Sequence, residues 1–294
     1  MLLAAEIAQP IVFGVASGAA IGLVAIGLVL IYKSSRVFNF AAGEFVTLGA
    51  FGLYLGDRVW DLPYPVAMVV GVLAGLITAL LVERFVVRPL SERPRVTILV
   101  ATAAVATILI PIELMVGGVK PFPAAPAISG IGVKVLGVYF SPQRALIVAA
   151  LALSGLGLAY FFARTDLGLA TLASSQEPTA SRLVGIRLNR ISMLTWGTAG
   201  LLGGLAGVLL TPLTSTFAAG YGTTSVLISA FTAAVLGGMT SIPGAFVGGI
   251  VVGLVQAFAQ FDLQSISGSP DLAILVVLVG VLLVRPTGLL GKEA

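Results

Sequence analysis

Long apolar runs separated by short polar stretches make up almost the whole chain. Crossing the hydrocarbon of a bilayer takes about 20 largely apolar residues, and most of the runs approach that length. They cover residues 11–31, 40–56, 64–82, 96–116, 143–163, 190–211, 225–240, 244–261 and 271–284. The pattern predicts an all-α, polytopic helical membrane protein with eight or nine membrane segments, in a single transmembrane domain over residues 1–294.

The seventh and eighth runs are nearly one apolar stretch. Only Ser241-Ile242-Pro243-Gly244 separates them, and each is short for a full crossing. Such a pair forms either a complete helical hairpin or a broken, re-entrant element, which lipid tolerates only where protein or a cavity covers the freed backbone. A short or broken segment near 225–244 is therefore predicted, and both forms stay open.

Composition supports the membrane class and narrows the chemistry. The 294 residues are 58% hydrophobic and 10% charged, whereas a soluble domain is about 25% charged. The chain has no cysteine and no histidine, which removes disulfides, thiolate metal sites and the commonest general base. It also has no Gly-x-x-x-x-Gly-Lys-Ser/Thr phosphate loop. We expect no catalytic residue, metal or cofactor on this chain and no nucleic-acid partner. Because the phosphate loop is missing, another chain or a gradient must drive any transport.

The sixteen basic residues are unevenly distributed over the loops. Twelve follow the first, third and fifth runs or lie in the C-terminal tail, namely Lys33, Arg36, Arg84, Arg88, Arg93, Arg95, Arg164, Arg182, Arg187, Arg190, Arg285 and Lys292. The other side has Arg58, Lys120, Lys134 and Arg144. Because cytoplasmic loops are enriched in Lys and Arg, the N-terminus is predicted outside and the C-terminus inside. Residues 164–190 are then cytoplasmic, and 117–142 form an extracytoplasmic loop with a short β-hairpin in IGVKVLGVYF.

Residues 164–190 are the longest polar interruption that carries basic residues. Pro178 favours a first helical turn and Gly185 suits the position past a helix end, so a short helix from Pro178 to Val184 is predicted. One face of that helix carries a small apolar knob with a basic rim, formed by Ala180, Leu183, Val184 and Arg187. The knob suits a shallow groove on a soluble partner, and it equally suits a helix resting on lipid head groups.

Two acidic residues fall inside apolar runs, where an ionisable group is costly and marks a functional candidate. Glu44 lies about one turn into the second run, in Asn39-Phe40-Ala41-Ala42-Gly43-Glu44-Phe45. It either pairs with a basic residue near the interface or takes part in gating or the translocation path. Glu113 is near the outer end of the fourth run, where its side chain can reach the interface. Polar residues that line a path or bond a neighbouring helix are Asn39, Thr47, Thr198 and Gln256.

Glycines recur at every fourth residue in several runs. Examples are Gly14-Gly18-Gly22, Gly71-Gly75, Gly200-Gly204, Gly244-Gly248 and Gly249-Gly253. Small residues at this spacing let two helix backbones approach closely in lipid. The stripes therefore predict tight helix crossings.

Four stretches in the right order resemble one known family. They are Gly22-Leu23-Val24-Ala25-Ile26-Gly27-Leu28 with Arg36-Val37-Phe38-Asn39-Phe40-Ala41 and Gly43-Glu44-Phe45, then Ala180-Ser181-Arg182-Leu183-Val184-Gly185-Ile186, then Ala234-Val235-Leu236-Gly237-Gly238 with Ser241-Ile242-Pro243-Gly244-Ala245, and finally Arg285-Pro286-Thr287-Gly288-Leu289-Leu290-Gly291. The chain is similar to the H-type (LivH-like) permease subunit of bacterial ABC transporters for branched-chain amino acids. It departs from the family at Ala42, where histidine is usual.

The resemblance implies a permease subunit of an ABC importer in the bacterial inner membrane. Its partners would be a second, M-type permease in a heterodimer, two cytoplasmic ATPases that use ATP and Mg, an extracytoplasmic binding protein and membrane lipid. Urea, short amides and other small organic solutes are alternative substrates, and an ion-coupled secondary transporter or channel is the alternative from another class. The resemblance makes 164–190 the ATPase-coupling loop, with contacts expected at Glu177, Pro178, Ala180, Leu183, Val184, Gly185, Ile186 and Arg187.

Overall fold

The computed structural model describes residues 2–118, 120–124, 126, 130, 132–135, 138–285 and 287–290. Its long helices are α1 (Leu2–Ser35), α3 (Tyr64–Val82), α4 (Arg95–Gly117), α5 (Pro142–Arg164), α8 (Leu188–Thr214) and α10 (Ile242–Asp262). The shorter ones are α2 (Ala42–Tyr54), α6 (Asp166–Gln176), α7 (Pro178–Leu183), α9 (Leu227–Gly237) and α11 (Ser269–Val284). Short π- or 3₁₀-helical pieces are η1 (Leu55–Val59), η2 (Glu83–Val87), η3 (Arg88–Leu90) and η4 (Gly222–Val226).

Each predicted apolar run forms a helix, which confirms the all-α polytopic class. In the described part of the chain, six helical stretches are long and apolar enough to cross a membrane: Ile7–Ser35, Tyr64–Leu90, Arg95–Met115, Pro142–Arg164, Leu188–Thr214 and Ile242–Asp262. The stretches Gly222–Gly237 and Ser269–Val284 are apolar but shorter. The predicted short segment near 225–244 is present, because η4 and α9 together cover only Gly222–Gly237. The helix α10 begins at Ile242, with the Ser241 hydroxyl accepting the Gly244 N–H at 3.1 Å, and is long enough to cross.

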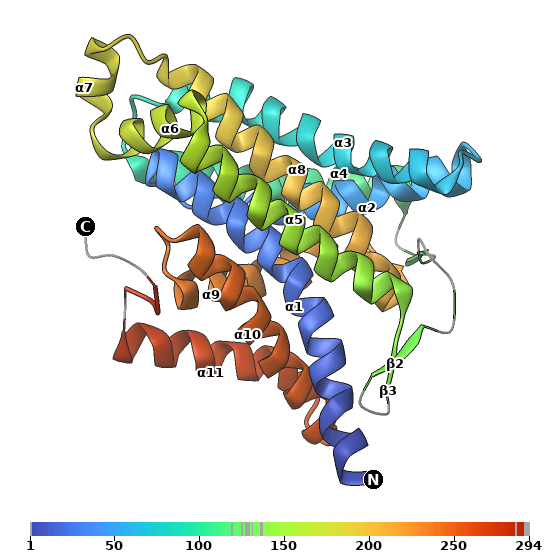
Figure 1. Cartoon of the computed structure of the whole chain (residues 1–294). Helices are drawn as coiled ribbons and strands as arrows, with labels where there is room; N and C mark the ends of the chain where they lie inside the picture. The colour runs from blue at the N-terminus through green and yellow to red at the C-terminus, as the bar shows by residue number, and fades with distance from the viewer. Residues whose placement is uncertain are drawn as a thin grey trace.

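Two antiparallel helices, α1 and α8, form the centre of the bundle (Figure 1). They are the most buried of the six crossing stretches. The most extensive packing of α1 is on α10, and that of α8 is on α3. The chain thus has two halves with corresponding helices, α1-α2-α3-α4 and α8-α9-α10-α11. The first helix of each half packs on the third helix of the other half, α1 on α10 and α8 on α3.

Glycines make both of these packings possible. A Cβ on Gly18 of α1 would lie 2.6 Å from the Gly249 carbonyl oxygen of α10. A Cβ on Gly204 of α8 would lie 2.9 Å from the Val72 carbonyl oxygen of α3, and one on Gly75 would lie 2.6 Å from the Gly204 Cα. The glycine stripes are therefore the places where helix backbones touch, as predicted.

Replacing Gly204 with valine is expected to lower the free energy of unfolding by about 1–3 kcal/mol or more, because overpacking forces two backbones apart. Gly157→Val on α5 is the matched control, since a Cβ at Gly157 would meet nothing within 4 Å. The measurement is thermal unfolding of the purified variants in detergent. Equal unfolding temperatures for the two variants would contradict the tight α3–α8 crossing.

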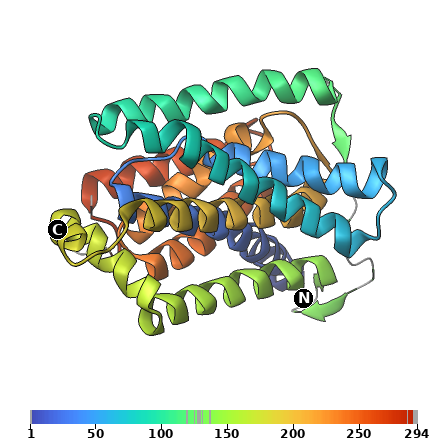
Figure 2. The ribbon, with the colours of Figure 1, turned by 90° about the horizontal axis from the view of Figure 1, so that it is seen from above.

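The two ends of the bundle differ in their loops. Seen from above, α6 and α7 lie at one end, and the start of α1 and a small β-hairpin lie at the other (Figure 2). The hairpin pairs β2 (Val133–Val135) with β3 (Val138–Phe140), as the sequence predicted. A second pair joins β1 (Phe122–Pro123) to β4 (Thr216–Phe217). Residue 119 and several between 125 and 137 of the predicted outer loop lie outside the described residues.

Candidate functional site

Two short helices meet at their N-termini inside the bundle. The helix α2 starts at Ala42, after the non-helical residues 36–41, and η4 with α9 starts at Gly222, after α8 has ended at Thr214. A Cβ on Gly43 would lie 2.6 Å from the Thr223 backbone nitrogen, and one on Gly222 would collide with the Gly43 carbonyl. Only glycine at both positions allows this contact, which we call the helix junction (Gly43, Glu44, Thr47, Gly220, Gly222 and Thr223).

The helix junction lies near the middle of the membrane-spanning bundle. A Cβ on Gly203 would lie 2.8 Å from the Cβ of Phe45, the residue after Glu44. Gly203 is the sixteenth of the 27 residues of α8 counted from Leu188. The prediction that Glu44 lies about one turn from the cytoplasmic interface is therefore wrong. Residues 36–41, which form no helix, separate the end of α1 from the start of α2.

Glu44 and Glu113 come together at this junction. Both are buried, with 0% and 3% of their surface exposed, and their carboxyl groups lie within hydrogen-bonding reach of each other. The Gly220 N–H donates to Glu113 Oε2 at 2.8 Å, whereas no other donor in the described residues reaches either oxygen of Glu44. A hydrogen bond between two carboxyl groups requires a proton on one of them. A direct hydrogen bond between Glu44 and Glu113 would therefore need one protonated carboxyl, and Glu113 does not extend to the interface.

Other polar groups complete the helix junction. The Gly222 N–H donates to Thr47 Oγ1 at 3.0 Å, and the Ala41 N–H donates to Asn39 Oδ1 at 2.9 Å. Asn39 Nδ2 and Thr223 Oγ1 are buried and have no hydrogen-bond partner among the described residues. The sequence had identified Asn39, Glu44 and Thr47 as candidates, but it gave no sign of Thr223 or of the glycine backbone that meets them.

Thr198 and Gln256 belong to other contacts. Thr198 Oγ1 donates to the Leu194 carbonyl of its own helix at 2.8 Å. Gln256 Nε2 donates to Ser229 Oγ at 3.2 Å and so joins α10 to α9. The structure gives both side chains hydrogen-bond partners away from the helix junction.

Replacing Glu44 with glutamine is expected to change stability by less than about 1 kcal/mol, because a carboxamide can still bond Glu113. Glu44→Ala leaves Glu113 without that partner in a buried site, and a loss of about 1–3 kcal/mol is expected. Thermal unfolding of the two variants side by side measures the difference. If glutamine proves as damaging as alanine, the shared proton is not the contact that holds the junction.

The predicted short helix is present in the polar segment 164–190. It is α7, and Gly185 follows it with φ 86°. The Ile186 N–H donates back to the Ser181 carbonyl at 2.9 Å and closes the end of the helix. Leu183 and Val184 are 85% and 78% exposed. The sequence missed α6, which precedes α7 and is capped by the Thr165 hydroxyl accepting the Gly168 N–H at 3.0 Å.

The other predicted coupling residues surround this apolar pair. Glu177, Ala180 and Arg187 are exposed, and Ile186 is half-buried. The backbone of Pro178 begins α7. The helix α7 lies at the end of the bundle opposite the β2–β3 hairpin (Figure 1).

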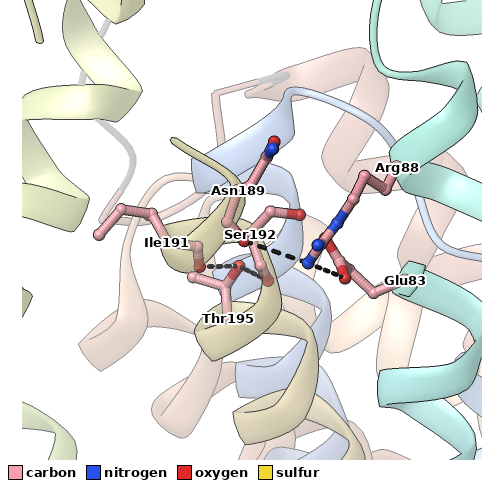
Figure 3. A network of polar contacts seen from close by, with 6 residues as sticks. All are labelled: Glu83, Arg88, Asn189, Ile191, Ser192 and Thr195. Atoms are coloured by element: carbon pink, nitrogen blue, oxygen red, sulfur yellow. Dashed lines mark hydrogen bonds and ion pairs between the residues drawn. The ribbon is translucent and has the colours of Figure 1, made fainter. Parts of the chain in front are cut away.

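A partly buried ion pair connects the end of α3 to the start of α8, directly after α7 (Figure 3). Arg88 donates to Glu83 through Nη2 at 2.8 Å and Nε at 3.2 Å, and Glu83 is 0% exposed. Arg88 Nη2 also donates to the Asn189 carbonyl at 3.5 Å. Sequence reasoning missed Glu83, because it follows the third apolar run and looked like a loop residue. The pair fixes the first turn of α8 against η2.

Comparison with known proteins gives consistent matches. Residues 11–285 match the family model described as branched-chain amino acid transport system / permease component. A high-affinity branched-chain amino acid transport system permease protein, BraD of Pseudomonas aeruginosa, is 30% identical over 97% of this chain and 95% of its own length. The probable branched-chain amino acid transport permease protein LivH of Methanocaldococcus jannaschii is 29% identical, over 92% and 88% of the two chains.

Two further matches extend this comparison. The Escherichia coli high-affinity branched-chain amino acid transport system permease protein LivH is 28% identical over 95% of this chain and 94% of its own length. Among solved structures, PsaBC from Streptococcus pneumoniae in complex with Fab has a similar fold, with a TM-score of 0.53 and 14% identity over 95% of this chain and 91% of that one.

Proposed function

The chain belongs to the family of branched-chain amino acid transport permeases, and on that premise we propose that it is a membrane permease subunit of an ABC importer. It moves branched-chain amino acids into the cytoplasm by alternating access. The names of its relatives support this substrate class. Hydrolysis of ATP with Mg takes place on partner ATPase chains, so this chain is a transport subunit and not an enzyme.

The observation that carries the proposal is the exposed apolar pair of α7. Leu183 and Val184 are among the most exposed large apolar side chains of the described residues, and they project from a short helix at one end of the bundle. An exposed apolar contact with a polar rim is typical of a docking surface. We assign it to an ATPase subunit, with Glu177 and Arg187 at the rim.

The charges at the two ends support an orientation. The end with α6 and α7 holds most of the basic residues, which favours the cytoplasmic side. The N-terminus and the β2–β3 hairpin then face outward, where a binding protein delivers substrate. The chain is thus a multi-pass protein of the cytoplasmic (inner) membrane that pairs with a second permease, and the substrate passes between the two.

There are two second candidates, one with a different substrate and one with a different mechanism. Urea or a short amide would use the same permease architecture. An ion-coupled transporter is favoured by one specific observation, which is the pair of buried carboxyls where two short helices meet, because buried carboxyls and interrupted helices form ion sites in secondary transporters.

The test is uptake into vesicles that contain the purified complex with its binding protein. We expect leucine uptake that requires ATP and is unaffected when ion gradients are collapsed. Uptake by this chain without any ATPase, following a proton or sodium gradient, would overturn the ABC proposal and support the ion-coupled candidate. Competition by urea or short amides but not by isoleucine or valine would change the substrate class.

A further inference from the structure

The short helix α6 follows the long helix α5 after a single capping residue, Thr165 (Figure 1). The Thr165 hydroxyl donates to the Phe161 carbonyl at 2.7 Å and accepts the Gly168 N–H at 3.0 Å. A Cβ on Gly168 would collide with the Phe161 carbonyl, so that only glycine lets the first turn of α6 pack this closely on the last turn of α5. The start of α6 is therefore fixed at the level where α5 ends.

The side chains of α6 are distributed in an unusual way. Gly168, Thr171 and Ser174 are buried, and the two hydroxyls donate to carbonyls of α6 itself at 2.7 Å and 3.0 Å. Leu167 and Leu169, by contrast, are 52% and 53% exposed. A helix that covers a core in water turns its large apolar side chains inward. These two leucines are turned outward, and the described part of the chain covers only about half of each.

The position of the two leucines along the chain places them at a membrane surface. The helix α5 has 23 residues, which is about 35 Å at 1.5 Å per residue. The hydrocarbon of a bilayer is about 30 Å thick, so both ends of α5 reach the head groups. Leu167 and Leu169 come three and five residues after Arg164, the last residue of α5.

The outer face of α5 leads to the same level. Leu153, Leu156 and Tyr160 are 69%, 69% and 68% exposed and follow the i, i+3, i+7 spacing of one helix face. Arg164 is exposed and continues this face by one turn. Tyrosine is enriched at membrane–water interfaces, and arginine extends its charged head to water along an apolar stem. The lipid-facing side of α5 therefore ends in an interfacial pair directly before α6.

We propose that the first turn of α6, with Leu167 and Leu169, is a membrane anchor inserted at the head-group boundary of the leaflet at this end. The bilayer is the surface that fits, because the leucines continue a face of α5 that the bundle leaves open to lipid, at the depth where α5 leaves the hydrocarbon. Interfacial helices bury leucine at this boundary. Residues 164–190 then have two parts, the lipid-held α6 and α7, which projects into water.

The experiment uses the absence of cysteine from the chain, since a spin label on one introduced cysteine reports one position. Leu167→Cys and Leu169→Cys are labelled in the full-length chain in phospholipid nanodiscs. Collisions of the label with oxygen, which dissolves in lipid, are compared with those of a water-soluble nickel chelate. We expect oxygen collisions to exceed nickel collisions at both positions, as at the lipid-facing reference Tyr160→Cys. The aqueous reference Glu92→Cys, exposed in the loop before α4, should show the reverse.

A second substitution tests the anchor itself. In the chain labelled at position 167, Leu169→Asp should lower the lipid-inserted population about tenfold, because burying one leucine contributes at least that factor. The matched variant Leu169→Phe keeps a large apolar group and should leave the label in lipid.

Three results would overturn the proposal. One is that nickel collisions exceed oxygen collisions at Leu167→Cys and Leu169→Cys, which puts the leucines in water. Another is that both kinds of collision are rare, which means that protein covers them. The third is that oxygen collisions are lost when the ATPases are added, which assigns the leucines to ATPase docking. Because the chain is first measured alone, failure of the anchor is distinguishable from failure of the ATPase contact at α7.

Discussion

Replacing Leu183 with aspartate should reduce ATP-driven uptake to background while the permease itself stays folded. Leu183 is 85% exposed and so has little packing to lose, which means that the stability of the isolated permease should be unchanged. If α7 docks on an ATPase as proposed, the same side chain is buried in the assembled transporter. Losing its apolar contact costs about 1.5–3 kcal/mol, and burying a carboxylate in its place costs several more. Affinity for the ATPase should therefore fall by at least about 100-fold.

Two measurements test this expectation. Co-purification reports whether the ATPases still bind, and vesicle uptake reports transport. Leu183→Met, which keeps the size and apolar character, should behave like the unmodified chain. Full uptake and a stable complex with Leu183→Asp would show that α7 rests on lipid head groups and makes no essential contact with an ATPase.

Replacing Arg88 with leucine should lower the free energy of unfolding by about 3–5 kcal/mol, because it leaves the fully buried carboxylate of Glu83 without its cation. Glu83 is 0% exposed, and Arg88 supplies both of its hydrogen bonds. The double change Glu83→Leu with Arg88→Leu should recover most of this loss, since two apolar groups of similar size often replace a buried ion pair at little cost.

Thermal unfolding of the single and double variants gives the coupling between the two residues. Arg84→Leu is the matched control, because Arg84 is exposed in the same turn, and a change within about 0.5 kcal/mol is expected. If the double variant is no more stable than Arg88→Leu alone, the pair is held by contacts other than its charges.

The long helices and the short helix α7 could be predicted from local patterns. Lipid forces each long apolar run to be a helix, and Pro178 with Gly185 marks the bounds of α7 within the polar segment. The glycine spacing likewise predicted close crossings, although it could not say that Gly18 meets Gly249 or that Gly204 meets Gly75. Partners of that kind are more than a hundred residues apart, and a single sequence carries no record of which stripes face each other.

The helix junction could not be predicted for the same reason. Glu44 and Glu113 look like two isolated carboxyls in sequence, and their meeting depends on α4 lying beside the start of α2. The break between α1 and α2 was predicted, since the apolar runs end at 31 and resume at 40. Nothing in residues 36–41 indicates that α2 starts inside the bundle.

The exchange of packing partners between the two halves determines when the fold can be completed. The helix α1 is inserted first during synthesis, yet the surface it needs belongs to α10, more than two hundred residues later. The glycine stripe of α1 therefore stays exposed to lipid, or is covered by another protein, until the last quarter of the chain has been synthesised. Contacts this distant along the sequence slow folding. Neither half separated between α5 and α8 should form its native bundle alone, and a nascent chain truncated before α10 is the form most exposed to quality-control proteolysis.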